Sequence, residues 1–84
     1  MAIGIDRTPN PNALKFTVGK PVGGPTTFTE ANASDSALAE ELLAIPGVVS
    51  MFMTADFVTL TKTGETSWDE IETRAVEALE SHFS

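Results

Sequence analysis

Residues 8–16 read Thr-Pro-Asn-Pro-Asn-Ala-Leu-Lys-Phe, and this stretch decides the fold because a stiff loop passes directly into a strand. Pro9 and Pro11 fix their own φ angles and keep the residues before them out of the helical region. Asn10 and Asn12 can each close an Asx turn on nearby backbone. The alternation of apolar and polar residues that follows predicts a strand with one side facing the core.

The rest of the chain predicts further strands and two helices. Strands are expected at residues 26–30, 48–53 and 57–63, with residues 3–5 as a short edge strand and residues 19–25 as a mobile surface connection. One helix is expected after an N-cap at Ser34 and the other after an N-cap at Ser67. The order ββαββα predicts an α+β fold, a two-layer sandwich of about four strands with two helices on one face. Residues 1–84 are expected to form one domain.

The register of the hairpin over residues 48–63 can be predicted from its two faces. An even-numbered loop around Ala55-Asp56 sets three facing pairs: Met53 with Val58, Met51 with Leu60, and Val49 with Lys62. The same register places four residues together on the opposite face: Ser50, Phe52, Thr59 and Thr61. We therefore expect one face to enter the core and the other to form an open, threonine-rich surface.

The composition restricts the classes of partner. The net charge is −7, and residues 64–84 alone hold six acidic residues against one arginine. This field repels a phosphate backbone, so no nucleic acid partner is expected. The acidic residues predict solvated helix faces or, alternatively, a basic docking partner. We find no signal-peptide or membrane-spanning pattern, so no membrane partner is expected and a cytoplasmic location is predicted.

The opening stretch also carries a resemblance. Residues 8–16, together with residues 50–52, residues 56–62, Trp68 and the closing residues 81–83, resemble the N-terminal domain of the Nfu/NifU family. This resemblance implies an accessory role in iron–sulfur cluster assembly. Full-length members carry a second domain whose Cys-x-x-Cys pair holds the cluster, whereas this chain contains no cysteine. The chain is therefore expected to act as a stand-alone, scaffold-type domain through protein–protein contact.

Few residues could carry out chemistry. The one histidine, His82, lies near the chain end, and neither cysteine nor tyrosine is present. Because clusters need thiolates or imidazoles and general acid–base catalysis needs a well-placed proton carrier, we expect no catalytic residue, no metal ligand and no cofactor. The chain is predicted not to be an enzyme.

Binding is the remaining class of function. The candidate partner-binding residues lie in the opening loop, on the first strand and around the hairpin: Thr8, Asn10, Asn12, Lys15, Phe52 and Phe57. The loop is either a turn that satisfies its own backbone or a preorganised recognition surface. The two phenylalanines are either partner-binding anchors or residues buried by a rearranged loop or a dimer. The expected partner is an iron–sulfur scaffold, carrier or apo-target protein. A general peptide- or protein-binding adaptor unrelated to iron, or a small-ligand regulatory module, stays open, as does the oligomeric state.

Overall fold

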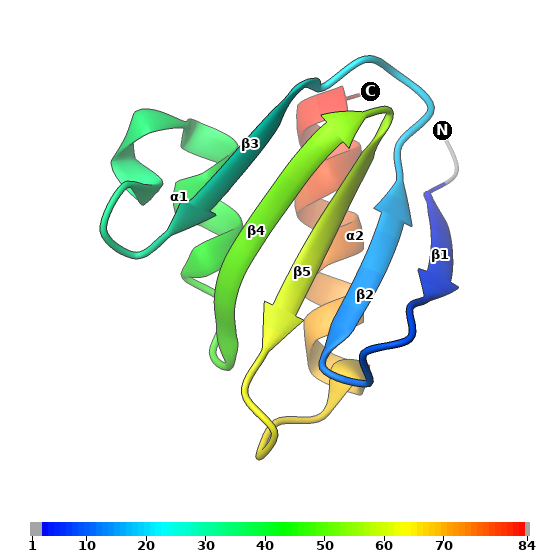
Figure 1. Ribbon diagram of the computed structural model, residues 1–84, viewed down its shortest axis with the longest axis vertical. Helices are drawn as coiled ribbons and strands as arrows, with labels where there is room; N and C mark the ends of the chain where they lie inside the picture. Colours follow the sequence, from blue (N-terminus) through cyan, green and yellow to red (C-terminus); the bar gives the residue numbers. More distant parts are fainter. Residues whose placement is uncertain (1–2, 84) are drawn as a thin grey trace.

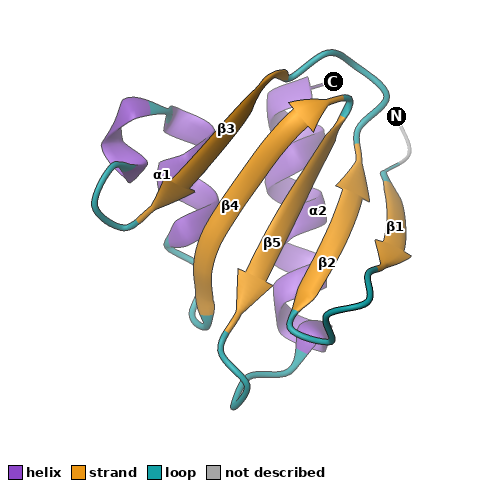
Figure 2. Ribbon diagram, viewed as in Figure 1, coloured by secondary structure: helices purple, strands orange, loops and turns teal. Residues whose placement is uncertain are grey.

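The computed structural model describes residues 3–83 and contains one antiparallel sheet of five strands (Figure 1). The strands are β1 (Gly4–Arg7), β2 (Ala13–Thr17), β3 (Gly23–Thr29), β4 (Val48–Ala55) and β5 (Phe57–Lys62). They lie side by side in the order β1-β2-β5-β4-β3. A short 3₁₀ helix, η1 (Ala33–Asp35), precedes α1 (Ala37–Leu43), and α2 (Trp68–Phe83) ends the described chain. Both α-helices cover the same face of the sheet, as predicted (Figure 2).

The predicted number of strands, about four, is wrong by one. Residues 4–7 pair with β2 along their whole length, from Gly4 opposite Thr17 to Arg7 opposite Leu14. The order is therefore βββαββα rather than ββαββα. The short edge strand predicted at residues 3–5 is confirmed, with its bounds shifted to residues 4–7; the count of about four strands had left it out. The α+β class and the two layers are confirmed.

Strand β3 begins earlier than predicted, at Gly23 instead of Thr26. Gly23 lies opposite Ala55, and the register shifts between Gly23 and Thr26. Just before the strand, the N–H of Val22 donates to the carbonyl of Ala55 over 2.9 Å. The expected connection over residues 19–25 is consequently shorter, because its last residues join the sheet. Pro25 fits an edge strand with an irregular register.

Helix α1 begins two residues later than predicted. Its N-cap is Ser36, whose hydroxyl accepts a hydrogen bond from the N–H of Ala39 over 3.3 Å. The expected cap, Ser34, lies inside η1. Both serines are followed by an acceptable first turn, so the cap rule alone does not distinguish them. Asn32 decides between them, because its side-chain oxygen accepts from the N–H of Thr29 and ends β3 in a tight turn.

The hairpin of β4 and β5 has the predicted register over most of its length. Met53 faces Val58 and Met51 faces Leu60, as expected. The third predicted pair is wrong, because the register shifts between Val48 and Ser50 and places Val48, not Val49, opposite Lys62. A bulge holds one extra residue on one strand. It turns Val48 into the core and leaves Val49 exposed.

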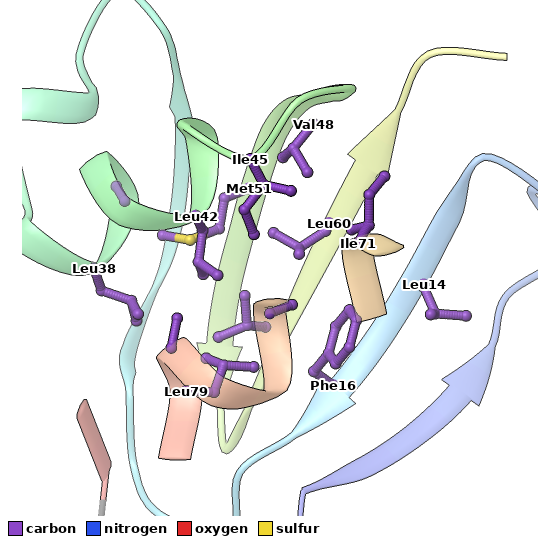
Figure 3. Close-up of a cluster of buried hydrophobic side chains, with 14 of the residues drawn as sticks. Leu14, Phe16, Leu38, Leu42, Ile45, Val48, Met51, Leu60, Ile71 and Leu79 are labelled. Carbon is purple, nitrogen blue, oxygen red and sulfur yellow. The ribbon is translucent and has the colours of Figure 1, made fainter. Parts of the chain in front are cut away.

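The core lies between the sheet and the two helices (Figure 3). Helix α2 contributes one apolar stripe, as predicted, and its Ser67 hydroxyl accepts from the N–H of Asp69 over 3.2 Å. The stripe's buried members are Ile71, Ala75, Ala78 and Leu79. The largest fully buried side chains of the core are Phe16, Leu42, Met51, Leu60, Ile71 and Leu79, with Val18 and Val58 beside them.

Candidate functional site

The face of the sheet that the helices leave uncovered, here called the open face, carries one row of residues across all five strands. Residues opposite each other in a sheet point to the same side. The register links five such residues in one row: Asp6, Lys15, Thr59, Phe52 and Thr27. The middle of the open face therefore presents an aromatic ring between two threonines, with charges only toward the β1 edge.

Phe52 lies on the open face, as the hairpin register predicted. Its neighbours across the strands are Thr59 on β5 and Thr27 on β3. It is 36% exposed although it lies on an interior strand of the sheet. A large apolar side chain in that position stabilises the fold less than a buried one would, and it offers apolar area to a partner.

Phe57 and Lys15 form a second aromatic feature of the open face. Phe57 begins β5, directly after the hairpin turn, and lies opposite Thr17 of β2. The ammonium group of Lys15 lies 4.4 Å from the centroid of the Phe57 ring. This is a cation–π contact, which orients both side chains and covers part of the ring. Phe57 is half-buried as a result, whereas Phe52 is exposed.

The loop of residues 8–12 uses its polar side chains on its own backbone. The hydroxyl of Thr8 lies 2.9 Å from the carbonyl oxygen of Asn10 and 3.0 Å from that of Ala13. The side-chain oxygen of Asn10 accepts from the N–H of Asn12 over 3.0 Å, which closes the Asx turn predicted at Asn10. The turn predicted at Asn12 is wrong, because the side-chain oxygen of Asn12 accepts from the ammonium of Lys62 instead. The loop is therefore held in one shape by its own residues, as its two prolines suggested.

Two residues that are distant from the loop in sequence also hold it in place, and sequence patterns did not assign them to this region. The indole N–H of Trp68 donates to the carbonyl of Pro11 over 3.1 Å. The ammonium of Lys62 donates to the side-chain oxygen of Asn12 over 3.3 Å and lies 5.7 Å from the Trp68 ring centroid. Lys62 is only 9% exposed. Because these pairs are 50 or more residues apart, no local pattern could have shown them.

The six candidate residues thus separate into two groups. Lys15, Phe52 and Phe57 lie together on the open face. Thr8, Asn10 and Asn12 lie in the loop before β2, at the opposite end of the strands from the β4–β5 turn (Figure 1). A shallow hollow of ≈ 170 Å³ lies between this loop and Trp68. Strand β2 connects the loop to the open face. The loop has polar side chains that bind its own backbone, whereas the open face has two aromatic rings and a lysine.

The described residues provide little for chemistry. Among residues 3–83, no group of three or more histidine, aspartate or glutamate side chains is placed to hold a metal ion. His82 is paired with Glu41 of α1 over 2.8 Å, which ties the two helices together. No helix in the described part of the chain is long and apolar enough to cross a membrane.

A family model described as "Scaffold protein Nfu/NifU N terminal" matches residues 3–84. This chain belongs to the Nfu/NifU N-terminal family. Among its relatives, the human "NFU1 iron-sulfur cluster scaffold homolog, mitochondrial" is 48% identical over 68 residues, which cover 77% of this chain and 27% of the human protein. The Arabidopsis thaliana "NifU-like protein 5, mitochondrial" is 43% identical over 82% of this chain and 26% of its own length. The chain thus spans about a quarter of these relatives.

Two solved structures share the fold. The solution structure of a NifU-like protein from Saccharomyces cerevisiae aligns with a TM-score of 0.85 at 28% identity, over 95% of this chain and 76% of that one. The crystal structure of protein SAV1430 from Staphylococcus aureus aligns with a TM-score of 0.80 at 30% identity, over 93% and 98% of the two chains.

The predicted cytoplasmic location is wrong by the same comparison. The human and the Arabidopsis relatives are named as mitochondrial proteins, not cytoplasmic ones. The prediction rested on the composition near Met1. The matched stretch is only 26–31% of each of these relatives, so the residues near Met1 do not report the subcellular location of a whole protein of this family.

Proposed function

We propose that this Nfu/NifU N-terminal domain is a non-catalytic accessory module of iron–sulfur cluster assembly that acts by binding a scaffold, carrier or apo-target protein. Family membership and the relatives named as cluster scaffolds support the setting. The observation that carries the mode of action is the exposed Phe52 on the open face, flanked by threonines and close to the Lys15–Phe57 pair.

The open face suits a protein partner in its chemistry. Threonine hydroxyls can donate and accept hydrogen bonds, and the aromatic rings supply apolar area at a low cost in side-chain entropy. Interface energy is concentrated in a few aromatic or arginine anchors surrounded by near-neutral contacts. Phe52 is proposed as the anchor, and Phe57 and Lys15 as the adjoining contacts.

The loop of Thr8, Asn10 and Asn12 is proposed to contribute through its rigidity. Its side chains satisfy nearby backbone groups and Lys62, so they hold the loop's shape. A surface that is already ordered loses less conformational entropy when a partner binds. In this proposal the loop frames one end of the binding surface, and the open face makes the main contacts.

The proposal also states that the cluster belongs to the partner. The chain has no cysteine, and its one histidine is paired with Glu41. Purified protein incubated anaerobically with iron and sulfide is therefore expected to stay colourless. Stoichiometric iron retained through gel filtration would contradict this part of the proposal.

Titration calorimetry against purified proteins of three kinds tests the partner class: a cluster scaffold, a cluster carrier and an apo-target, with a cysteine-free protein of similar size as the control. Saturable binding to at least one of the three, and none to the control, is expected. Equal binding to the control would favour a general adaptor unrelated to iron.

A further inference from the structure

The β-bulge at the start of β4 exposes an apolar side chain, Val49. The register shift between Val48 and Ser50 leaves Val49 exposed at 47%, more than any other large apolar side chain of the described residues. Pairing between β3 and β4 extends only to Thr29 opposite Ser50, so Val49 lies beyond the end of β3. Bulges re-aim side chains and are common beside functional sites.

Val49 forms one wall of an apolar groove, here called the β4 groove. The groove has a volume of ≈ 460 Å³ and lies between the C-terminal half of α1, the turn that follows it and the start of β4. Its principal lining residues are Glu30, Glu40, Leu43, Ile45, Val48 and Val49. Gly47, in the turn, has a φ of +97°, and a Cβ there would lie 2.5 Å from the Thr66 side chain. The turn therefore requires glycine at position 47 and packs closely against Thr66.

The charged side chains that line the β4 groove have one sign, whereas Lys62 and Arg74 lie beside lining residues without lining the groove themselves. Glu30, just after β3, and Glu40, on α1, both line the groove. Residues 21–61, which include β3, α1 and β4, hold five carboxylates and no lysine, arginine or histidine. An apolar groove between two carboxylates is complementary to an apolar side chain that has cations on either side of it.

From this complementarity we infer that the β4 groove binds a short segment of a partner protein in which an aliphatic side chain is flanked by lysine or arginine. The aliphatic side chain lies against Leu43 and Val49, and the flanking cations face Glu30 and Glu40. A second copy of this chain is a less favourable occupant, because two copies of net charge −7 repel each other. The inference is independent of binding at the open face.

NMR titration of the ¹⁵N-labelled chain with a synthetic peptide tests the inference. The peptide carries leucine and valine flanked on both sides by lysines, and the matched peptide has serines in place of leucine and valine. Saturable amide shifts are expected at residues 43–49 and at Glu30 and Glu40, with affinity that falls as salt is added. The serine peptide is expected to bind much more weakly. Equal binding of both peptides would overturn the inference.

Three variants separate the groove from general attraction to an acidic protein. Val49→Ser is expected to weaken peptide binding about fivefold by removing apolar contact. Glu30→Gln with Glu40→Gln is also expected to weaken it about fivefold. The control pair Glu65→Gln with Glu70→Gln removes the same charge from exposed positions that do not line the groove, and it should change affinity less than about twofold. Equal losses from the two glutamine pairs would contradict the inference.

Two further results would overturn it. Shifts centred on α2 or on the open face would place the peptide elsewhere, and shifts at Val49 that depend on the concentration of the chain alone would show that a second copy fills the groove. Because Val49 is exposed, the Val49→Ser variant should fold normally. Thermal unfolding of the variant checks this. Phe52→Ser separates this inference from the proposed function. The variant should lose affinity for a cluster-assembly partner and should still bind the lysine-flanked peptide in the β4 groove.

Discussion

Along β5, buried residues alternate with residues of the open face. Val58 and Leu60 are fully buried under the helices, whereas Phe57, Thr59 and Thr61 lie on the open side. The outer surfaces of α1 and α2 carry most of the acidic residues, while the row across the open face has one acid, Asp6, and one base, Lys15. The same strand therefore serves stability on one side and presents a nearly neutral surface on the other.

This difference separates two consequences of mutation. Substitutions on the covered side should lower the free energy of unfolding, because they open cavities in a close-packed core. Substitutions on the open side should change binding while the fold persists, because those side chains are partly solvated already. The predictions below are arranged from the largest expected change in stability to the smallest.

Phe16→Ala is expected to have the largest effect, because Phe16 is fully buried between the sheet and the helices. Truncating a buried phenylalanine costs about 3–5 kcal/mol, a large part of the roughly 4–12 kcal/mol available to a chain of this length. Urea denaturation followed by Trp68 fluorescence measures the change. Phe52→Ala, its counterpart on the open face, should lose less than about 1.5 kcal/mol. Equal losses would break the distinction between the faces.

Trp68→Phe tests whether the contacts that hold the loop of residues 8–12 contribute to the stability of the fold. The variant removes the hydrogen bond to the carbonyl of Pro11 but keeps an aromatic ring beside Lys62. A loss of about 0.5–1.5 kcal/mol in unfolding free energy is expected. Amide hydrogen exchange at Asn12 and Ala13 should become faster. An unchanged exchange rate at both amides would mean that Trp68 does not hold the loop.

Lys15→Met sharpens the comparison within the open face. It removes the cation from the Phe57 ring and keeps an unbranched side chain of similar length. The expected loss is about 0.5–1 kcal/mol, the range for an exposed cation–π contact. Thermal unfolding measures it, with Lys20→Met on the exposed connection as the control. A similar effect of the two variants would show that charge alone, and not the ring contact, matters.

Ala55→Gly should have the smallest effect and the opposite sign. Ala55 has a φ of +51° in the β4–β5 turn. This conformation destabilises a residue with a Cβ by about 1–2 kcal/mol, and glycine removes that strain. The greater conformational freedom of glycine in the unfolded chain offsets about 0.5–1 kcal/mol of the gain. A net gain of about 0.5 kcal/mol is expected in denaturant unfolding. A loss would contradict the strained conformation of Ala55.

Much of the fold could be predicted from patterns that act over short distances. The pairing of Met51 with Leu60, the open-face position of Phe52 and the buried stripe of α2 follow from two periodicities. The family could also be recognised from residues 8–16 and the later matching segments.

The other features of the fold depend on alternatives that local sequence patterns do not distinguish. Ser34 and Ser36 are both good caps, and the turn at Asn32 selects between them. The bulge that exposes Val49 is selected by core packing of Val48. The contacts of Lys62 with Asn12 and of Trp68 with Pro11 join residues distant in sequence. The β4 groove is formed by residues whose proximity depends on these choices.

The most direct test of the central claim compares binding and folding in one variant, Phe52→Ser with Phe57→Ser. Affinity for a purified cluster-assembly partner and unfolding free energy are measured on the same preparation, next to the unmodified chain. The claim predicts at least a tenfold loss of affinity, about 1.4 kcal/mol or more, with a folded and cooperative domain. Unchanged affinity in the folded variant would contradict docking through the open face.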